Sequence, residues 1–447
     1  MHKQSGGKAS GVREVTAPLA PGPAIIVILL LTLFLTLESA PTIQLVPRAT
    51  VIMPAMQVAI FLLLLPTLRV RLTGISPLML LLWLALFAWS LFSIFWSGYA
   101  PHSLGRCLLV YCPSLFLLLL IYADPRPLET FWSFARGFIF FGTVLAAVAL
   151  LLLTLGKVIP IDRWELQVLG LGPFKLAQAV YFKGSWPLVS SLTGNPNTLA
   201  AWLMASLILT RAMHKARRLS TTQFLLVGGL QGIVMLLTLS RTGLGATLLG
   251  LVLFWVLSAP GEGSRFARGY LVAVGGIVGV ATGLAYLFDP GRAGLMASSL
   301  SGRWALWEAA WRAFQNRPVA GCGFGVASDG MLRDLGLSVV HLHNVYFSIL
   351  VEIGLVGFFL FMGFWLLGAI AGGWRALDFV RSGKRDGGLA LATAGSLLVA
   401  LLLHQVFESM ILRTNFYTIL WIYLAGFVTH PLVETPSTLF SRNKRKP

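Results

Sequence analysis

Residues 341–357 read HLHNVYFSILVEIGLVG, and they mark the point where a polar segment becomes an apolar helix. Two imidazoles, His341 and His343, and the amide of Asn344 stand at the start of this apolar run. A polar cluster at the entrance of a membrane-length helix is suited to chemistry at a membrane surface. The rest of the chain decides which side of the membrane His343 faces and which other groups reach that side.

Composition identifies a polytopic membrane protein. The 447 residues are 57% hydrophobic and only 11% charged, and their mean hydropathy is +0.81. A soluble domain cannot cover its surface with so few polar residues. The cysteines, Cys107, Cys112 and Cys322, form no Cys-x-x-Cys pair, which excludes a disulfide framework and a Cys-rich metal site. The sequence leaves open whether Cys107 or Cys112 forms a disulfide with Cys322.

Hydropathy predicts an all-α fold with about 12 transmembrane helices, because a bilayer core about 30 Å thick needs about 20 helical residues. Residues 24–37 resemble a signal peptide, but Glu38-Ser39-Ala40-Pro41 is a poor cleavage site, so we expect an uncleaved first span. The predicted spans are 24–40, 50–68, 77–96, 105–122, 131–155, 195–212, 222–239, 242–258, 270–288, 344–370, 388–411 and 415–430.

The net charge of +18 follows from membrane topology. With a cytoplasmic N-terminus, the four short outer connections carry one basic residue each: Arg48, Arg106, Arg241 and Arg413. Such asymmetry obeys the positive-inside rule, so membrane lipids, and not nucleic acid, are the expected partners of the basic residues. Of the 34 basic residues, 20 fall in inner segments: Lys3, Lys8, Arg13, Arg69, Arg71, Arg126, Arg211, Lys215, Arg217, Arg218, Arg265, Arg268, Arg375, Arg381, Lys384, Arg385, Arg442, Lys444, Arg445 and Lys446.

One of the two long outer connections contains an aromatic helix. Ser301 is a plausible N-cap, and Arg303 opens the helix, which runs to Arg317. An amphipathic helix lying in the membrane interface has this pattern, and so does a helix packed on the bundle. Both arrangements place Arg303 near the membrane surface. The aromatic stripe consists of Trp304, Trp307, Trp311 and Phe314.

Arg241, Arg303 and His343 are the candidate site residues. Arg241 lies between two apolar segments without room for a loop, so its guanidinium reaches the outer boundary, where it binds an anion or snorkels to lipid phosphates. His343 is a candidate base, with a helix cap or a packing residue as the alternative. Two cations and one base suit transfer of a group from a diphosphate leaving group to a hydroxyl. A zinc site through His341 and His343 lacks further ligands.

Other polar residues surround these candidates. Glu352 lies about 13 Å deeper than His343 on the opposite helix face, where it is a functional carboxylate, a partner of Arg136 or a polar helix contact. His404 and Glu408 share a face at i and i+4 and either support the site or bridge helices. The residues expected around the site are Asn344, Tyr346, His404 and Glu408.

Four motifs resemble the O-antigen ligase and polysaccharide polymerase family of bacterial envelope proteins. They span residues 190–360 in one order and all fall on the outer side of the predicted topology. The motifs are Gly194-Asn195-Pro196-Asn197-Thr198-Leu199-Ala200, Ser240-Arg241-Thr242-Gly243, Ser301-Gly302-Arg303 with Trp307, and His343-Asn344-Val345-Tyr346 leading to Glu352, Gly354 and Gly357.

The resemblance implies a glycosyltransferase of the membrane C type in the bacterial inner membrane, with its active site facing the periplasm. It implies an undecaprenyl-diphosphate-linked glycan as donor, held by Arg241 and Arg303, and His343 as the base that activates an acceptor hydroxyl without a metal or cofactor. A ligase transfers the glycan to a lipid A core sugar in lipopolysaccharide biosynthesis. A polymerase transfers it to another lipid-linked saccharide, and the motifs favour the ligase slightly.

We expect a single membrane domain, because neither long loop is large enough to form a hydrophobic core of its own. A transporter or flippase of lipid-linked saccharide is the alternative class, suggested by twelve spans and intramembrane Glu352 and His404. The expected regions are a cytoplasmic tail at 1–23, helices 1–9 at 24–288 with a periplasmic segment at 156–194, a periplasmic loop at 289–343, helices 10–12 at 344–430, and a basic cytoplasmic tail at 431–447.

Overall fold

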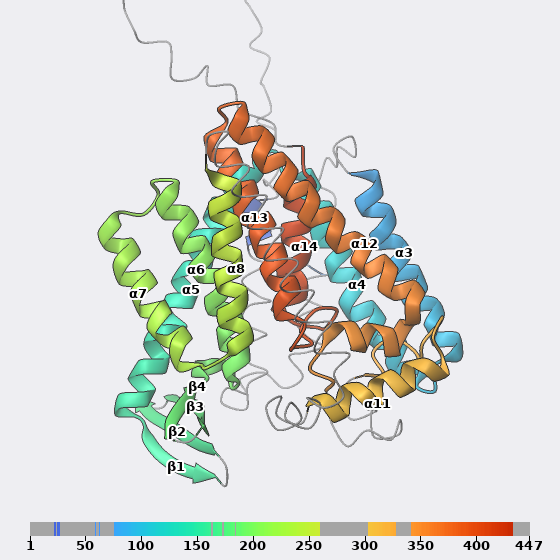
Figure 1. Ribbon diagram of the computed structural model, residues 1–447, viewed down its shortest axis with the longest axis horizontal. Coiled ribbons are helices and arrows are strands. Elements are labelled where there is room, and N and C mark those ends of the chain that lie inside the picture. The colour runs from blue at the N-terminus through green and yellow to red at the C-terminus, as the bar shows by residue number, and fades with distance from the viewer. Residues whose placement is uncertain are drawn as a thin grey trace, which may run out of the picture.

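The computed structural model is mostly helical (Figure 1). It describes residues 76–161, 164–171, 174–183, 185–259, 303–327 and 341–431, with residues 22, 23, 25, 26, 59 and 62. The helices are α3 (Pro77–Phe92), α4 (Ala100–Ala123), α5 (Pro127–Leu155), α6 (Pro196–Lys215), α7 (Thr221–Leu237), α8 (Arg241–Ser258), α11 (Arg303–Asn316), α12 (Val345–Arg381), α13 (Arg385–His404) and α14 (Phe416–Thr429), with the short turns η3 (Ser93–Trp96) and η4 (Ser191–Thr193).

Six of the described helices are long and apolar enough to cross a membrane, as a polytopic membrane protein requires. They are α3 with η3, α4, α5, α8, α12 and α13, whereas α7 and α14 are shorter apolar helices. The predicted span at 270–288 lies outside the described residues, and those at 24–40 and 50–68 do so except for residues 25, 26, 59 and 62. The boundary of 388–411 needs correction, because α13 ends at His404 and residues 405–415 form a polar connection to α14.

Helices α6, α8, α12 and α14 are among those that begin at the lower end of the bundle in Figure 1, which we call the site end. Each N-terminus is capped by a side-chain oxygen that accepts a backbone N–H in the first turn, which satisfies donors that a helix start leaves unpaired. The four caps are Asn195, Ser240, Asn344 and Asn415. Three of them belong to the motifs found in the sequence.

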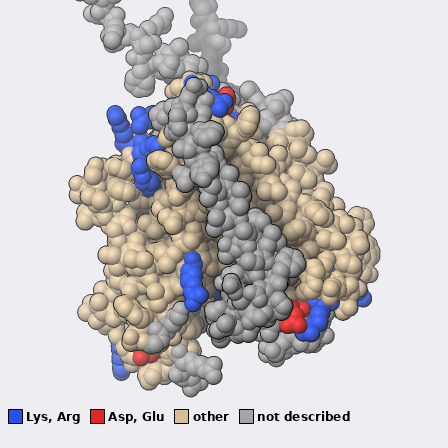
Figure 2. All heavy atoms as spheres, in the orientation of Figure 1, with Lys and Arg blue, Asp and Glu red and all other residues tan. Residues whose placement is uncertain are grey.

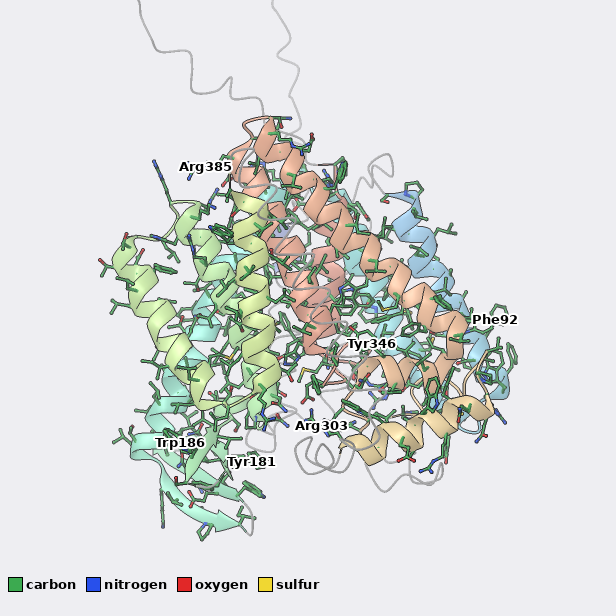
Figure 3. The ribbon with its side chains drawn as sticks, in the orientation of Figure 1. Phe92, Tyr181, Trp186, Arg303, Tyr346 and Arg385 are labelled. Atoms are coloured by element: carbon green, nitrogen blue, oxygen red, sulfur yellow. The ribbon has the colours of Figure 1, made fainter. Side chains whose placement is uncertain are left out.

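Basic residues gather at the opposite end, which we call the basic end. Arg385 lies there at the top of Figure 3, and Figure 2 shows Lys and Arg clustered over the same part of the visible face. Arg218 from the α6–α7 turn donates to Asp386 of α13 at 2.9 Å, so the two basic turns lie side by side. The residues of these turns are Lys215, Arg217, Arg218, Arg381, Lys384 and Arg385.

Aromatic side chains fill the core between α3, α4, α12 and α14. The ring of Trp83 lies 5.1 to 5.7 Å from the rings of Tyr111, Phe364 and Trp421. All of these rings are buried and contribute both apolar area and ring–ring contacts. The three cysteines are free thiols, so the disulfide left open by the sequence does not form.

A break inside α12 shapes the site end. Gly354 has φ +66°, a left-handed conformation that interrupts the helical hydrogen bonds. Segment 318–323 and the indole of Trp89 form hydrogen bonds with backbone groups on both sides of the break. The bonds are Cys322 N–H to the Val351 carbonyl (2.8 Å), Gly323 N–H to Glu352 (2.8 Å), Trp89 Nε1–H to Ile353 (2.8 Å) and Leu355 N–H to Pro318 (2.9 Å).

Residues 157–189 correct the expectation of an entirely helical chain. They form an antiparallel sheet of four strands in the order β1 (Lys157–Ile161), β2 (Trp164–Leu171), β3 (Phe174–Lys183) and β4 (Trp186–Val189). Gln167 lies opposite Val158 and Gln178 in the register. Gln178 donates to the Ala149 carbonyl of α5 at 3.0 Å and accepts from Ser191 N–H at 3.0 Å. These bonds attach the sheet to the bundle at the site end.

The predicted aromatic helix is present as α11 and packs on α12. Ala310 and Phe314 are buried against Leu342 and Val351. Trp311 remains 45% exposed, so the aromatic stripe does not bury itself wholly in this contact. The proposed cap Ser301 and the side chain of Trp304 lie outside the described residues. Contact of the exposed face with the membrane interface stays a prediction.

The break at Gly354 yields a stability prediction. A Cβ at this position would collide with the Val319 carbonyl, and the positive φ would strain any L-residue, so Gly354→Ala should destabilise the protein by about 3 kcal/mol. Thermal unfolding in detergent measures the change. Gly363→Ala in the same helix is the control, because the added methyl meets only Leu82 at 3.6 Å or more. Equal melting temperatures for both variants would contradict this account.

Candidate functional site

The carboxylate of Glu408 connects the motifs at the site end. Its Oε1 accepts from Asn197 Nδ2 at 2.7 Å and from Arg303 Nη2 at 3.2 Å, and its Oε2 lies 3.4 Å from His343 Nδ1. Glu408 lies in the 405–415 connection, and its side chain is only 8% exposed. The structure therefore brings the predicted residues Arg303 and His343 onto one buried carboxylate, with Arg303 labelled in Figure 3.

The backbone around His343 is shaped to present its ring. His343 has φ +48°, an uncommon conformation for a residue other than glycine. Trp307 Nε1 donates to the Leu342 carbonyl at 3.0 Å, and Asn344 Nδ2 donates to the Val406 carbonyl at 2.8 Å. Asn344 Oδ1 also accepts from Phe347 N–H at 3.0 Å and thereby caps α12. The residues on both sides of His343 are fixed, so its left-handed conformation is imposed by the surrounding structure.

Arg303 is held by the packing of α11 on α12 and by two hydrogen bonds to the 405–415 connection. Nη1 donates to the Phe407 carbonyl at 2.6 Å, while Nη2 forms the ion pair with Glu408 at 3.2 Å. The ring of Trp307 lies one helical turn further and contacts Phe407 at 5.7 Å. The planar guanidinium thus spans a carbonyl and a carboxylate in a fixed orientation.

Asn197 is a site residue that the sequence reasoning missed, although it lies in the quoted Gly-Asn-Pro-Asn motif. Asn195 caps α6 by accepting Asn197 N–H at 2.8 Å, which leaves the Asn197 amide to donate to Glu408. Pro196 occupies the first helical position, where its missing N–H costs nothing. Two amides around a proline at a helix start were the available signal for a polar function.

The environment of Glu408 keeps its carboxylate ionised. Burial acts to raise its pKa, but the hydrogen bond from His343 and the charge of Arg303 outweigh burial, so the pKa is lowered. His341 differs from its neighbour. Although the side chain is partly exposed, desolvation and the positive charge of Arg413 lower the pKa of His341 to about 4. At pH 7 His341 is neutral.

Arg241 lies at the site end but outside this array. It is the first residue of α8 and is exposed, and no carboxylate among the described residues lies within ion-pair distance. A Cβ on Gly243 would come within 2.5 Å of the Cβ of Ala200, so α8 packs tightly on α6 one turn from Asn197. Arg241 therefore lies at the exposed start of a helix that packs on α6, and its part in the site stays a prediction.

Glu352 belongs to a second buried ion pair. Its Oε1 accepts from Arg413 Nη1 at 3.0 Å and from Ala327 N–H at 3.1 Å, and the two side chains are 3% and 13% exposed. The suggested partner Arg136 is instead exposed on α5, so that alternative is wrong. Because Glu352 ties α12 to two connections, its contacts are those of a structural residue.

The remaining expected residues support the helices around the site. Tyr346, labelled in Figure 3, donates its hydroxyl to the Leu402 carbonyl at 2.6 Å and so joins α12 to α13. His404 is fully buried as the last residue of α13, and it makes no hydrogen bond with Glu408. The two residues therefore do not pair as neighbours on one helical face. Among the residues that the structure describes, no three His, Cys, Asp or Glu side chains are placed to hold a metal ion.

The site thus combines a nitrogen base, the guanidinium group of Arg303 and several helix N-termini at one end of an apolar bundle. The starts of α6, α8, α12 and α14 direct their positive dipole ends to this region, which favours an anion. His343 keeps 35% of its side-chain surface exposed, so its ring is accessible beyond the contact with Glu408. An anionic leaving group and a proton-donating acceptor are the reactants that fit these groups.

Comparison with known protein families gives a match over part of the chain. Residues 224–362 match the family model described as O-Antigen ligase. The matched region contains Arg241, Arg303 and His343, whereas Asn197 and Glu408 lie outside it. Among curated proteins, no sequence matches the chain.

The lowered pKa of Glu408 predicts a dependence of stability on pH. An unfolded glutamate has a pKa near 4.5, so the stabilisation is complete above that value and disappears as the pH falls through the lower folded pKa. We expect Glu408→Gln to melt below the wild type at pH 7 and this difference to shrink at pH 4 or lower. Glu129→Gln, at an exposed pair with Arg126, is the control that should melt like the wild type. A difference that does not change with pH would contradict the assignment.

Proposed function

We propose that this chain, whose residues 224–362 match the O-antigen ligase family model, transfers a glycan from undecaprenyl diphosphate to a saccharide hydroxyl. The observation that carries the proposal is the joint contact of Arg303 and His343 with Glu408, because it places a cation and a base from two separate motifs in one site. Arg241 at the start of α8 supplies a second cation beside it.

The reaction follows from these groups. His343 takes the proton of the acceptor hydroxyl as its oxygen attacks the anomeric carbon of the donor sugar, and the bond from that carbon to the diphosphate breaks. Arg303, Arg241 and the helix N-termini stabilise the negative charge that develops on the departing undecaprenyl diphosphate. Attack opposite to the leaving group inverts the anomeric configuration. The chain's own residues supply both the base and the charge stabilisation, so we propose a transfer without a metal.

We propose that the site faces the periplasm across the bacterial inner membrane. The basic turns at the opposite end support this orientation, since basic connections stay in the cytoplasm. The α6–α7 and α12–α13 turns both lie there, and the site end carries the sheet and α11. The apolar helices in between would leave the diphosphate at the membrane surface with its lipid tail in the bilayer.

Two acceptors fit this chemistry, a lipid A core sugar and a second lipid-linked saccharide, corresponding to a ligase and a polymerase. We favour the ligase, following the family that residues 224–362 match. Transport of the lipid-linked saccharide has less support, because Glu352, which suggested it, is bonded to Arg413 and to Ala327 N–H. A carboxylate held by these bonds is poorly suited to bind and release a transported group on alternate sides of a membrane.

His343→Gln should abolish transfer because the variant has no base at this position, and we expect a loss of about 100-fold or more. The assay gives purified protein the lipid-linked glycan with either a lipid A core acceptor or a second lipid-linked saccharide. The acceptor that supports transfer distinguishes a ligase from a polymerase. His341→Gln is the matched control two residues away, and it should retain activity near pH 7, where His341 is neutral. Undiminished turnover by His343→Gln would overturn the proposed mechanism.

Replacement of the arginines should weaken binding of the donor. Each guanidinium makes charge-assisted hydrogen bonds to phosphate oxygens, so Arg241→Gln and Arg303→Gln should raise the Kd for undecaprenyl diphosphate about 10-fold or more. Ligand-induced shifts of the melting temperature measure this Kd. Arg312→Gln on α11 is the control, since Arg312 forms only an exposed pair with Glu308 and should leave the Kd unchanged. If Arg241→Gln and Arg303→Gln bind undecaprenyl diphosphate as tightly as Arg312→Gln and the wild type do, the two arginines are excluded from the donor site.

A further inference from the structure

Glu408 touches His343 at one particular ring nitrogen. The contact of 3.4 Å joins Oε2 of the carboxylate to Nδ1 of the imidazole. In a neutral imidazole only one nitrogen carries the proton, and an ionised carboxylate can only accept a hydrogen bond. A proton on Nδ1 is therefore favoured, which leaves the lone pair on Nε2. Nε2 is then the atom that can take a proton from an acceptor.

The carboxylate is itself held in place. Asn197 Nδ2 and Arg303 Nη2 both donate to Oε1, the oxygen that does not face His343. The backbone of Glu408 is fixed as well, because its carbonyl accepts from Val345 N–H at 3.1 Å. The neighbouring Ser409 hydroxyl lies 3.0 Å from that of Ser348 on α12. With three side-chain partners and a fixed backbone, Glu408 has one orientation, and that orientation fixes the imidazole ring.

We infer that Glu408 is a positioning residue for His343, and that Asn197 fixes Glu408 for this purpose. The inference rests on the proposed function and names residues outside the segment that matches the family. During transfer the acceptor proton moves to Nε2, the Nδ1 proton stays on the ring, and the positive imidazolium faces the Glu408 carboxylate. The proton on Nε2 then leaves to solvent or to the released diphosphate, which restores the neutral ring.

A purely structural role makes a different prediction. If Glu408 served only to hold Arg303, its loss would misplace that guanidinium and weaken donor binding. If Glu408 positions His343, its loss slows the chemical step, while Arg303 remains available to the diphosphate. The ratio between the effects on kcat and on the donor KM therefore separates the two roles.

Glu408→Gln tests the inference, because glutamine keeps the shape and the oxygen acceptor but removes the charge. We expect kcat to fall about 100-fold while the donor KM stays unchanged or decreases, since Arg303 loses a competing anion. Glu352→Gln is the matched control. It removes the charge of the other buried ion pair at the same end, and it should retain the wild-type kcat and donor KM at a lower melting temperature.

Asn197→Ala is the second variant, because it loosens Glu408 while both charges of the array remain. It should lower kcat with an unchanged donor KM, and Asn197→Asp should lower kcat further because it places a second carboxylate beside the first. If Glu408→Gln does not fold, the Asn197 variants carry the same test. A wild-type kcat in Asn197→Ala would then overturn the inference.

The outcomes also separate this inference from the proposed function. Loss of transfer in His343→Gln together with a wild-type kcat in Glu408→Gln overturns the positioning role and leaves the proposed function intact. A rise in the donor KM that accounts for the whole loss of kcat/KM in Glu408→Gln also overturns the positioning role, in favour of a structural one. Full activity of His343→Gln would overturn the proposed function itself.

Discussion

The shared carboxylate of Glu408 is the interaction on which the site depends. Its three partners are separated from it by 211, 105 and 65 residues along the chain, and they come from α6, α11 and the start of α12. A buried carboxylate with two cationic or polar donors on one oxygen repays its desolvation only when all partners are in place. The array is therefore cooperative: α6, α11 and the 405–415 connection must each dock correctly before any of the three motif residues is fixed.

A second constraint, the break in α12 at Gly354, makes this docking possible. A straight helix would carry its first turns along a single axis, whereas the break lets segment 318–323 enter and donate hydrogen bonds to the carbonyls of Val351 and Glu352. Glu352 and Arg413 close this region with the second buried ion pair. Two carboxylates thus hold the 405–415 connection in place. Arg413 of the connection pairs with Glu352 of α12, and Glu408 of the connection binds residues of α6 and α11. Two ion pairs in a largely apolar bundle determine the shape of its polar end.

Hydropathy and motif order predicted much of the helical fold and part of the site. The nine predicted spans that fall on described residues are helical over most of their length, because apolar runs of membrane length have few alternatives. The structure brings Arg303 and His343 to one carboxylate, whereas their roles and the proximity of Arg241 to a ligand stay predictions. Asn197 and the pairing of Glu352 with Arg413 were missed, since contacts across 211 and 61 residues leave no local pattern.

The sheet was missed for a different reason. Residues 157–189 show turn signals at Gly172-Pro173 and Gly184-Ser185 between runs rich in β-branched and aromatic residues. These signals are present in the sequence, but each strand is much shorter than a membrane span, so hydropathy does not separate the strands from the long connection. The extension of α12 to Arg381 had no such signal. Its last turns are mixed in polarity and are helical because they continue a long, well-packed helix.

The sheet and the site also differ in when they can form during biosynthesis. Strands β1–β4 pair only with their neighbours in sequence, so every strand pairing within the sheet is available once residue 189 has left the ribosome. The array around Glu408 needs residues from 197 to 408, and it cannot assemble until α13 has been inserted. A nascent chain therefore carries a folded surface sheet long before it carries a competent site. A chain that ends before Glu408 has all four strands of the sheet but lacks the carboxylate that joins the site residues.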